Sequence, residues 1–517
     1  MVVPEGSTKL LDDFPRGRDA QFVGTLPHSY FESPQNLAAT KSLQFDTHLN
    51  RESKLFMGVV GGEVIQGDRL ADGRLTRHIV GGTGIGIGDD RHHILLAGSR
   101  AGKGRSMLLP CLLSLPPTTS SLWLDPKGDL ARISIRYRSS IQQVGLLDPF
   151  GVAGSEAAKH RVVLNPIATL DPNNRRTFVP NSKLISDSII VSGDFKDKHW
   201  DTCSHQALSM LILHVATYWR YDGCRDLITV WHLAAELASA DPDNSGRYWL
   251  EQELLSNDAA NGAIRNLARQ FYDRTGGEFS SVLSNLRKHL DFLSIECMAD
   301  CLTGDSIDLR DLKRGAMSLY ISVPAMRMTD LSGWLRMIVQ LTLAAHEEEI
   351  SQLGSQTILG LDEMHVLGTL KCLEVAAAQI AGLGLKIVAV LQDLSQLKTH
   401  YPKNWETFIA NAAAIQAFGL ADETTLEYIS KRLGEAPTIS RSTNAPGFEQ
   451  ATKQAATGES WSLGVHRLMN AEEVGRFFAR DDKLLRQLVI RPGYRPMVLQ
   501  RAFYDQHEFF RGRFDER

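Results

Sequence analysis

A lysine that follows a loop of small residues is the feature of the sequence with the clearest chemical meaning. Residues 95–104 read LLAGSRAGKG, an apolar run and a loop that delivers Lys103 ahead of the segment Met107–Leu113. A strand that enters a tight turn before a helix leaves backbone N–H groups unpaired, and the helix dipole also favours negative charge there. The pattern predicts a triphosphate-binding loop followed by an amphipathic helix over Met107–Leu113.

The loop departs twice from the pattern G-x-x-x-x-G-K-[ST]. Ala97 replaces the first glycine, which is a mild change because a small residue can still make the turn. Gly104 replaces the hydroxyl residue that normally binds Mg²⁺, so the metal would need more waters or another carboxylate. An ordinary turn is the alternative interpretation of this loop taken alone. The candidate nucleotide-binding residues are Ala97, Gly98, Ser99, Arg100, Ala101, Gly102, Lys103, Gly104 and Arg105.

Two adjacent carboxylates far downstream supply a second half for such a site. The continuous apolar run Thr357–Leu361 is typical of a buried parallel strand, and it leads directly into Asp362 and Glu363. In enzymes that hydrolyse nucleoside triphosphates, the first acid at such a strand end holds Mg²⁺ and the second polarises the attacking water. An exposed acidic turn is the alternative, and the presence of Lys103 weighs against it.

Two other strand ends carry acidic residues as well. Leu122–Asp125 continues into Pro126, Lys127 and Gly128, and Val144–Asp148 is also followed by a proline. Ligands of open α/β sheets bind at the carboxyl ends of the strands, so these residues predict a polar rim around the nucleotide. The alternative is that each Asp-Pro pair only begins a turn.

The composition is that of a large globular protein with no global basic field. The 517 residues are 43% hydrophobic and 22% charged, with a net charge of −4. The sequence contains no apolar run near the roughly 20 residues that span a bilayer and no signal-peptide pattern at its start, so we expect a cytoplasmic protein. The six cysteines lack zinc-site spacing and are expected to be reduced and buried.

Changes of periodicity along the chain predict an interrupted α/β domain. Short β-like segments with glycine pairs fill 56–88, helical periodicity dominates from 198 to about 300, and strand patterns then resume. We therefore expect a mainly parallel sheet with an inserted all-α domain. The predicted divisions are an N-terminal extension (1–57), the first part of a nucleotide-binding domain (58–197), an all-α domain (198–300) and the second part of the nucleotide-binding domain (301–517).

An ordered set of motifs over about residues 90–510 resembles the coupling proteins of type IV secretion, the conjugation ATPases. The motifs are AGSRAGKG, LDPKGD, LLDPFG, Leu164–Pro166, Leu361–Glu363, LQDLSQL at 391–397, FGLADETTLEYISKRLG at 418–434 and LMNAEEV at 468–474. The resemblance also accounts for Gly104, because the phosphate loop of this family commonly reads G-K-G. It implies a RecA-like P-loop NTPase core, ATP and Mg²⁺ as cofactors, and a homo-hexamer with ATP between subunits.

The resemblance further implies roles for single residues. Lys103 would bind the β- and γ-phosphates, Asp362 the magnesium, and Glu363 would orient the attacking water. Gln392 would sense the γ-phosphate, while Asp125 and Lys127 would line the site. Gln396 is a weaker candidate because its spacing from Gln392 also fits a place in the next helix.

The implied partners are single-stranded DNA, a relaxase–DNA complex or protein effectors, together with the components of a secretion channel. Most members carry an N-terminal membrane anchor, whereas residues 1–55 here are polar. A separate membrane protein would then hold the cytoplasmic chain at the inner membrane.

The sequence also departs from the family where many members carry an arginine that reaches a neighbour's nucleotide. The corresponding stretch here is Ala381–Gly384, so hydrolysis is expected to be slow. Arg287 and Arg336 are alternatives for that role, although each is equally well explained as a solvated charge on a helix. Two other functions remain open: an FtsK-like duplex DNA translocase, although no winged-helix signature follows residue 434, and a nucleotide-binding substrate receptor with little hydrolysis.

Overall fold

The computed structural model describes residues 29–48, 50–69, 75–191, 198–237, 245–274, 277–351, 356–370, 380–443 and 459–515. About half of the expected N-terminal extension (1–57), residues 1–28, lies outside these ranges. The part of the extension that is described includes the short helix α3 (Pro34–Ala39), whose Leu37 is buried. Leu43 and Phe45 are also buried, against the neighbouring strands, so this part of the extension contributes to a hydrophobic core.

The centre of the molecule is an eleven-stranded sheet in the order β4-β1-β15-β14-β11-β5-β10-β9-β6-β8-β7. Neighbouring strands from β11 to β7 all run parallel. Most of these strands are continuous apolar runs because helices cover both faces of the sheet. The strands are β1 (Leu55–Val60), β4 (Thr83–Ile87), β5 (His92–Ala97), β6 (Ser121–Asp125), β7 (Gln143–Leu147), β8 (Met317–Ser322), β9 (Thr357–Leu361), β10 (Leu385–Leu391), β11 (Ala412–Phe418), β14 (Arg486–Ile490) and β15 (Met497–Gln500).

Four antiparallel strands extend one side of this parallel sheet. β14 pairs with β11, β15 with β14, β1 with β15, and β4 with β1. Phe510, near the C-terminus, is fully buried and packs edge-on against Phe56 of β1, with ring centroids 5.4 Å apart. The first and last described parts of the chain therefore meet on the same side of the sheet.

Two hydrophobic cores lie on opposite faces of the sheet, because alternate side chains of a strand point to opposite faces. Leu95 belongs to one core, and its neighbours Ile94 and Leu96 belong to the other. One core includes α4 (Leu109–Ser114) and α5 (Asp129–Ser139), and the other includes α15 (Ser332–Glu348).

The segment after the phosphate loop differs from the expected amphipathic helix. It begins with a π-helical turn, η1 (Gly104–Leu108), and continues as the short α4. Every side chain of Met107–Leu113 is buried, because this segment packs against the sheet and also against the C-terminal residues. The prediction that Met107–Leu113 is amphipathic was wrong.

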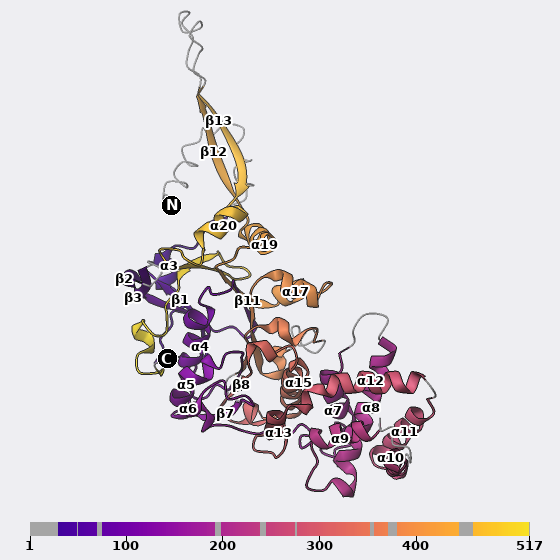
Figure 1. Cartoon of the computed structure of the whole chain (residues 1–517). Helices are drawn as coiled ribbons and strands as arrows, with labels where there is room; N and C mark the ends of the chain where they lie inside the picture. Colours follow the sequence, from indigo (N-terminus) through magenta and orange to yellow (C-terminus); the bar gives the residue numbers. More distant parts are fainter. Residues whose placement is uncertain are drawn as a thin grey trace, which may run out of the picture.

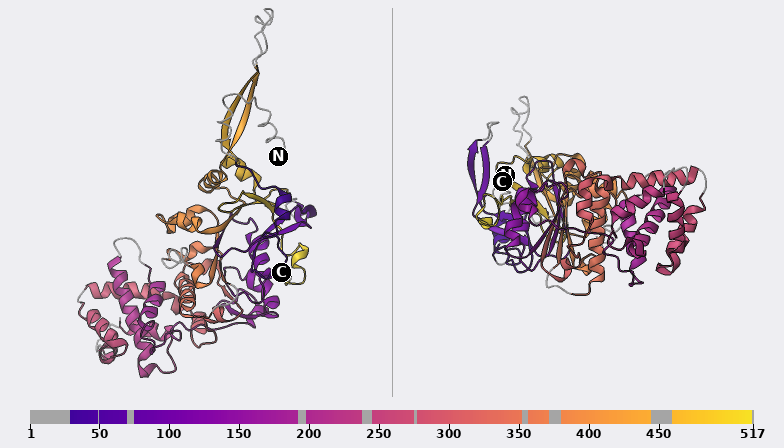
Figure 2. Two further views of the ribbon diagram at one scale, coloured as in Figure 1. Left: turned by 180° about the vertical axis from the view of Figure 1, so that it is seen from behind. Right: turned by 60° about the horizontal axis from the view of Figure 1, so that its bottom comes forward.

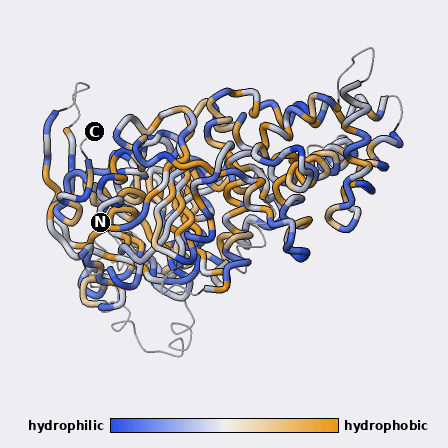
Figure 3. The backbone as a smooth tube through the Cα atoms, turned by 90° about the horizontal axis from the view of Figure 1, so that it is seen from below, coloured by the Kyte–Doolittle hydropathy of each residue, from blue (hydrophilic) through white to orange (hydrophobic). Residues whose placement is uncertain are grey.

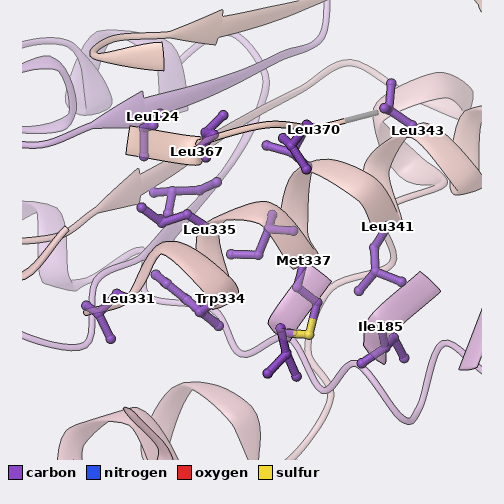
Figure 4. Close-up of a cluster of buried hydrophobic side chains, with 14 of the residues drawn as sticks. Leu124, Ile185, Leu331, Trp334, Leu335, Met337, Leu341, Leu343, Leu367 and Leu370 are labelled. Carbon is purple, nitrogen blue, oxygen red and sulfur yellow. The ribbon is translucent and has the colours of Figure 1, made fainter. Parts of the chain in front are cut away.

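A lobe of helices lies beside the sheet and is formed by residues between β7 and β8 (Figure 1). Its helices are α7 (Phe178–Ile189), α8 (Lys198–Thr217), α9 (Leu227–Glu236), α10 (Ser245–Ser256), α11 (Ala263–Tyr272), α12 (Gly277–Leu290) and α13 (Glu296–Leu302). Figure 4 shows how Ile185 of α7 and Met337 of α15 share the core with Leu124 of β6. α7 precedes residue 198 and links the lobe to the sheet.

The remaining elements are short helices and two hairpins. The helices are α6 (Ser155–Ala158), α14 (Asp311–Arg314), α17 (Leu394–His400), α18 (Trp405–Ala410), α19 (Glu423–Leu433) and α20 (Ala471–Phe477), and the 3₁₀ turns are η2 (Trp219–Tyr221), η3 (Ala260–Gly262), η4 (Asp291–Ser294), η5 (Ala325–Arg327), η6 (Met364–Leu367), η7 (Ile380–Leu383) and η8 (Glu508–Phe510). One hairpin is formed by β2 (Glu63–Arg69) and β3 (Leu75–Val80). The other is formed by β12 (Glu435–Thr443) and β13 (Glu459–Arg467), and this second hairpin projects away from the sheet (Figure 2).

The distribution of hydropathy agrees with these layers. Hydrophobic segments concentrate in the strands at the centre, and hydrophilic segments lie mostly around them (Figure 3). In the part of the chain that the structure describes, every helix is too short or too polar to cross a bilayer.

Candidate nucleotide-binding site

Four adjacent parallel strands bring the sequence-predicted residues to one edge of the sheet. β5, β10, β9 and β6 are neighbours in that order, and each ends next to a candidate residue. Lys103 follows β5, Gln392 follows β10, Asp362 and Glu363 follow β9, and Asp125 ends β6. Because carboxyl ends of parallel strands lie at the same edge, these side chains are close in space although far apart in sequence.

The phosphate loop has the backbone shape that its small residues permit. Gly102 has a φ of 91°, and Arg100 adopts the left-handed region with a φ of 57°. A Cβ on Gly98 would lie 2.2 Å from the carbonyl oxygen of Gly419, so only glycine fits at that contact. In contrast, a Cβ on Gly104 would meet nothing within 4 Å. The loop is therefore tightly packed at Gly98 and open at Gly104.

Lys103 makes ion pairs with both acids of β9. Its Nζ lies 2.8 Å from Asp362 Oδ1 and 2.5 Å from Glu363 Oε1. Burial opposes the charged amine, but the two carboxylates outweigh it and raise the pKa of Lys103. Burial raises the pKa of Asp362, with Lys103 opposing this effect. Although burial also acts against ionised Glu363, Lys103 and Gln392 hold its pKa below the usual value.

One carboxylate oxygen of Asp362 is buried without a hydrogen-bond donor. Its buried Oδ1 lies within ion-pair distance of Lys103 but accepts no hydrogen bond with acceptable geometry. A buried carboxylate oxygen without a hydrogen bond is costly, and carboxylate oxygens are the ligands that Mg²⁺ prefers. The donor set therefore fits a magnesium ion at Asp362.

Glu363 is held in a specific orientation by its backbone and its neighbours. It has a φ of 61°, a conformation that is uncommon for residues other than glycine. Gln392 Nε2 donates to Glu363 Oε2 at 3.2 Å, and His365 Nδ1 lies 3.5 Å from the same oxygen. Gln396, by contrast, accepts a bond from the backbone N–H of Gln392 through its Oε1 and belongs to α17.

Asp125 and Lys127 lie at this edge in different environments. The buried Asp125 accepts the N–H of Ala131 through Oδ2 at 2.9 Å and so caps the first turn of α5. Burial raises its pKa to about 7, and the nearby charge of Asp362 adds to the effect. Lys127 is exposed, and its charge acts on Asp362 in the opposite direction, lowering the pKa of that carboxyl.

The other loop residues differ in how their side chains are used. Ser99 and Arg100 are exposed, Ala97 and Ala101 are buried, and Arg105 is engaged by the C-terminal segment. The Arg105 guanidinium pairs with Asp505 at 2.7 Å and lies over the ring of Phe503, 4.4 Å from its centroid. Arg105 is thus next to the loop, but its charge is already paired.

The structure adds residues that the sequence analysis missed. His365 approaches Glu363, and the buried Arg501 donates to the carbonyl of Ala101 in the phosphate loop. Their position depends on contacts between distant segments, which no local motif reveals. His365 alone had a local signal, because it lies two residues after Glu363.

Arg336 does not fit the role of an arginine that reaches a neighbouring subunit. It is buried between α15 and α7, where its Nε donates to Ser188 O at 2.8 Å. Its guanidinium joins α15 to α7, and the expectation that Arg336 reaches a neighbouring subunit was wrong. Arg287 is exposed on α12 of the lobe.

The family model and the curated relatives that match this chain all belong to conjugative transfer or type IV secretion. A family model described as "Type IV secretory system Conjugative DNA transfer" matches residues 55–516. "Protein VirD4" from Rhizobium radiobacter is 25% identical over 373 residues, which cover 69% of this chain and 50% of that protein. "Conjugal transfer protein TraG" from Escherichia coli is 23% identical over 400 residues, 74% of this chain and 61% of that protein. The chain thus spans about half to three-fifths of these relatives.

Solved structures share the fold. The bacterial conjugative coupling protein TrwBΔN70, in an unbound form, aligns with a TM-score of 0.58 at 16% identity and covers 80% of this chain and 85% of that chain. TrwB in complex with ADP and Mg²⁺ aligns with a TM-score of 0.57 at 17% identity, covering 83% and 89% of the two chains. The overall arrangement of the α/β core is therefore that of the conjugative coupling protein TrwB.

Proposed function

Because this chain belongs to the type IV secretory system conjugative DNA transfer family, we propose that it is an ATP-hydrolysing coupling protein that delivers substrates to a secretion channel. The observation that supports this most directly is the convergence of Lys103 with Asp362 and Glu363 at one sheet edge. The proposed substrates are single-stranded DNA, relaxase–DNA complexes or protein effectors. TrwB has been solved with an ATP analogue and with ADP and Mg²⁺, which supports ATP and Mg²⁺ as cofactors here.

Each candidate residue has a role that follows from its position. Lys103 would leave the two carboxylates and bind the β- and γ-phosphates, since both phosphates and carboxylates attract the ammonium group. Asp362 would hold Mg²⁺, which supplies positive charge to the phosphates. Glu363, held by Gln392, would accept a hydrogen bond from the attacking water and orient it.

The loop from Ala97 to Arg105 would surround the phosphates, and Asp125 and Lys127 would border them. Gly98 and Gly102 permit the close approach of backbone N–H groups that a phosphate requires. Asp125 would act mainly by fixing the turn before α5, whereas Lys127 carries an exposed charge next to Asp362. Arg105 would keep its pairing with Asp505.

Slow hydrolysis and assembly into a homo-hexamer complete the proposal. An arginine supplied by a neighbour contributes factors of about 10³–10⁵ to such reactions, and the stretch before β10 has none. We also propose that the helical lobe contacts substrate, and that a separate membrane protein holds the chain at the inner membrane.

Steady-state ATP hydrolysis with and without single-stranded DNA tests the function. We expect Lys103→Ala to abolish ATP binding and Glu363→Gln to keep binding while losing hydrolysis. Lys159→Ala is a matched control, because Lys159 is an exposed lysine whose ion pair with Glu156 lies outside the site. Unchanged hydrolysis in Lys103→Ala would contradict both the coupling ATPase and an FtsK-like translocase. Tight ATP binding without turnover in any condition would favour the substrate receptor.

A further inference from the structure

Arg501 is a buried arginine whose hydrogen bonds go to backbone carbonyl oxygens of two chain segments. Its Nη1 donates to Ala101 O at 3.1 Å, in the phosphate loop. Its Nη2 donates to Arg480 O at 3.0 Å and Ala479 O at 3.3 Å, and its Nε to Leu485 O at 3.4 Å. The residue is only 1% exposed, so one side chain joins the loop to the segment that precedes β14.

The guanidinium charge of Arg501 lies in a buried position, where an uncharged side chain would pack equally well. Burial lowers the pKa of Arg501 to about 10, while Asp482 and Asp481 oppose the shift. Among the described residues, no carboxylate forms an ion pair with it. Removing a guanidinium from water is unfavourable, and an apolar side chain of similar size would fill the same space without that cost. The distinctive contribution of Arg501 is therefore its set of directed donors.

The contact with Ala101 determines the direction of a neighbouring donor. The carbonyl of Ala101 and the N–H of Gly102 belong to the same peptide unit, and in a trans peptide these two groups point in opposite directions. The described chain contains no cis peptide bond. A guanidinium that holds the carbonyl on the outer side of the loop therefore directs the Gly102 N–H to the inner side.

We propose that Arg501 is a positioning residue of the nucleotide site, which holds the Ala101 carbonyl so that the Gly102 N–H is directed at the bound phosphate. This inference rests on the nucleotide-binding function proposed above. The cationic donor also polarises the peptide unit, which makes the Gly102 N–H a stronger donor to an anion.

Other contacts hold the loop from the same C-terminal segment. The backbone N–H of Tyr504 donates to Arg105 O at 3.1 Å, and Asp505 pairs with the Arg105 side chain. The residues after β15 therefore contact the beginning of the helix as well as the loop. Arg501 contacts the loop at Ala101, before Lys103, whereas Tyr504 and Asp505 contact it at Arg105.

ATP affinity in the presence of Mg²⁺ tests the proposal in three variants of the full chain. We expect Arg501→Met to weaken ATP binding about tenfold or more, the size of one lost charge-assisted hydrogen bond, and Arg501→Lys to recover part of it. Arg138→Met is the matched control. Arg138, on α5, is also fully buried, and its guanidinium donates to a backbone carbonyl oxygen, Leu115 O, at 2.6 Å. Both methionine variants are expected to lower the thermal midpoint, but only the variant at 501 should lose affinity for ATP.

Equal ATP affinity in Arg501→Met and the unsubstituted protein, or an equal loss in Arg138→Met, would overturn the proposal. Hydrogen exchange of residues 98–106 in the absence of nucleotide provides a second test. We expect faster exchange in Arg501→Met and no change in Arg138→Met. If the unsubstituted protein binds no ATP, the proposed function is wrong, and the exchange rates still decide whether Arg501 holds the loop.

Discussion

At the scale of single residues, one lysine balances two carboxylates. Lys103 lies within ion-pair distance of Asp362 and Glu363, and no other described lysine or arginine forms an ion pair with either acid. Binding of a triphosphate would draw this charge away and leave two acids near four phosphate charges. Mg²⁺ restores the balance, so nucleotide and metal are expected to bind together.

Restoring a hydroxyl at residue 104 should strengthen metal binding. A Cβ there meets nothing within 4 Å, so Gly104→Ser adds a potential Mg²⁺ ligand without a clash. We expect the Mg²⁺ concentration needed for half-maximal ATP binding to fall about threefold, which corresponds to a gain of about 0.6 kcal/mol. Nucleotide titrations at a series of Mg²⁺ concentrations measure this.

Gly104→Ala separates the hydroxyl from the added Cβ in the same titrations. An identical Mg²⁺ dependence for the serine and alanine variants would show that residue 104 does not reach the metal.

The buried carboxyl of Asp125 predicts a pH dependence of stability. Its pKa of about 7 in the folded protein lies above the ordinary value of 3.8. Between these values the folded protein holds a proton that the unfolded chain has lost, so the free energy of unfolding falls as pH rises from about 4 to about 7. Asp125→Asn removes this titration and should gain stability relative to the unsubstituted protein over that range, by up to about 4 kcal/mol.

Thermal unfolding of both proteins across this pH range tests the prediction at Asp125. A constant difference between their midpoints from pH 4 to pH 7 would contradict it.

At the scale of elements, the phosphate loop depends on its contact with the end of β11. Gly98→Ala would place a Cβ 2.2 Å from the Gly419 carbonyl oxygen, which is backbone and cannot turn away. We expect this variant to lose stability by about 1–3 kcal/mol and to bind ATP at least tenfold more weakly. Gly277→Ala is the control, because a Cβ at Gly277 meets nothing within 4 Å. Calorimetry of both variants compares unfolding and ATP affinity, and normal ATP binding by Gly98→Ala would show that the loop adjusts freely.

The sequence was most informative about elements whose signal is local. β9 and most of β10 were predicted because Thr357–Leu361 and Ile387–Leu391 are continuous apolar runs, and the acids at 362 and 363 follow directly from the end of β9. The pairing of β14 with β11 and the position of Arg501 were not predictable, since both depend on contacts between distant segments. The segment 107–113 reads MLLPCLL, with no polar residue, and its burial against the sheet and the C-terminal residues agrees with that composition rather than with an amphipathic helix.

At the scale of the whole molecule, assembly is the main expectation. We expect six copies of the chain to associate when an ATP analogue and single-stranded DNA are both present, because ATP would be bound between subunits in the proposed hexamer. Mass photometry of the unsubstituted protein and of Lys103→Ala measures this, and the variant should remain smaller under the same conditions. A monomer of the unsubstituted protein in every condition would contradict the assembly.

The place where the helical lobe joins the sheet has a consequence for how such proteins can diversify. β7 and β8 are hydrogen-bonded neighbours, with Gln143 opposite Met317, although the whole lobe lies between them in sequence. The chain therefore leaves and re-enters the sheet at adjacent positions, and the strand register does not depend on the lobe's length. Changes in the length of the lobe can consequently leave two pairings unaltered, that of β7 with β8 and that of β8 with β6, the first strand of the candidate site.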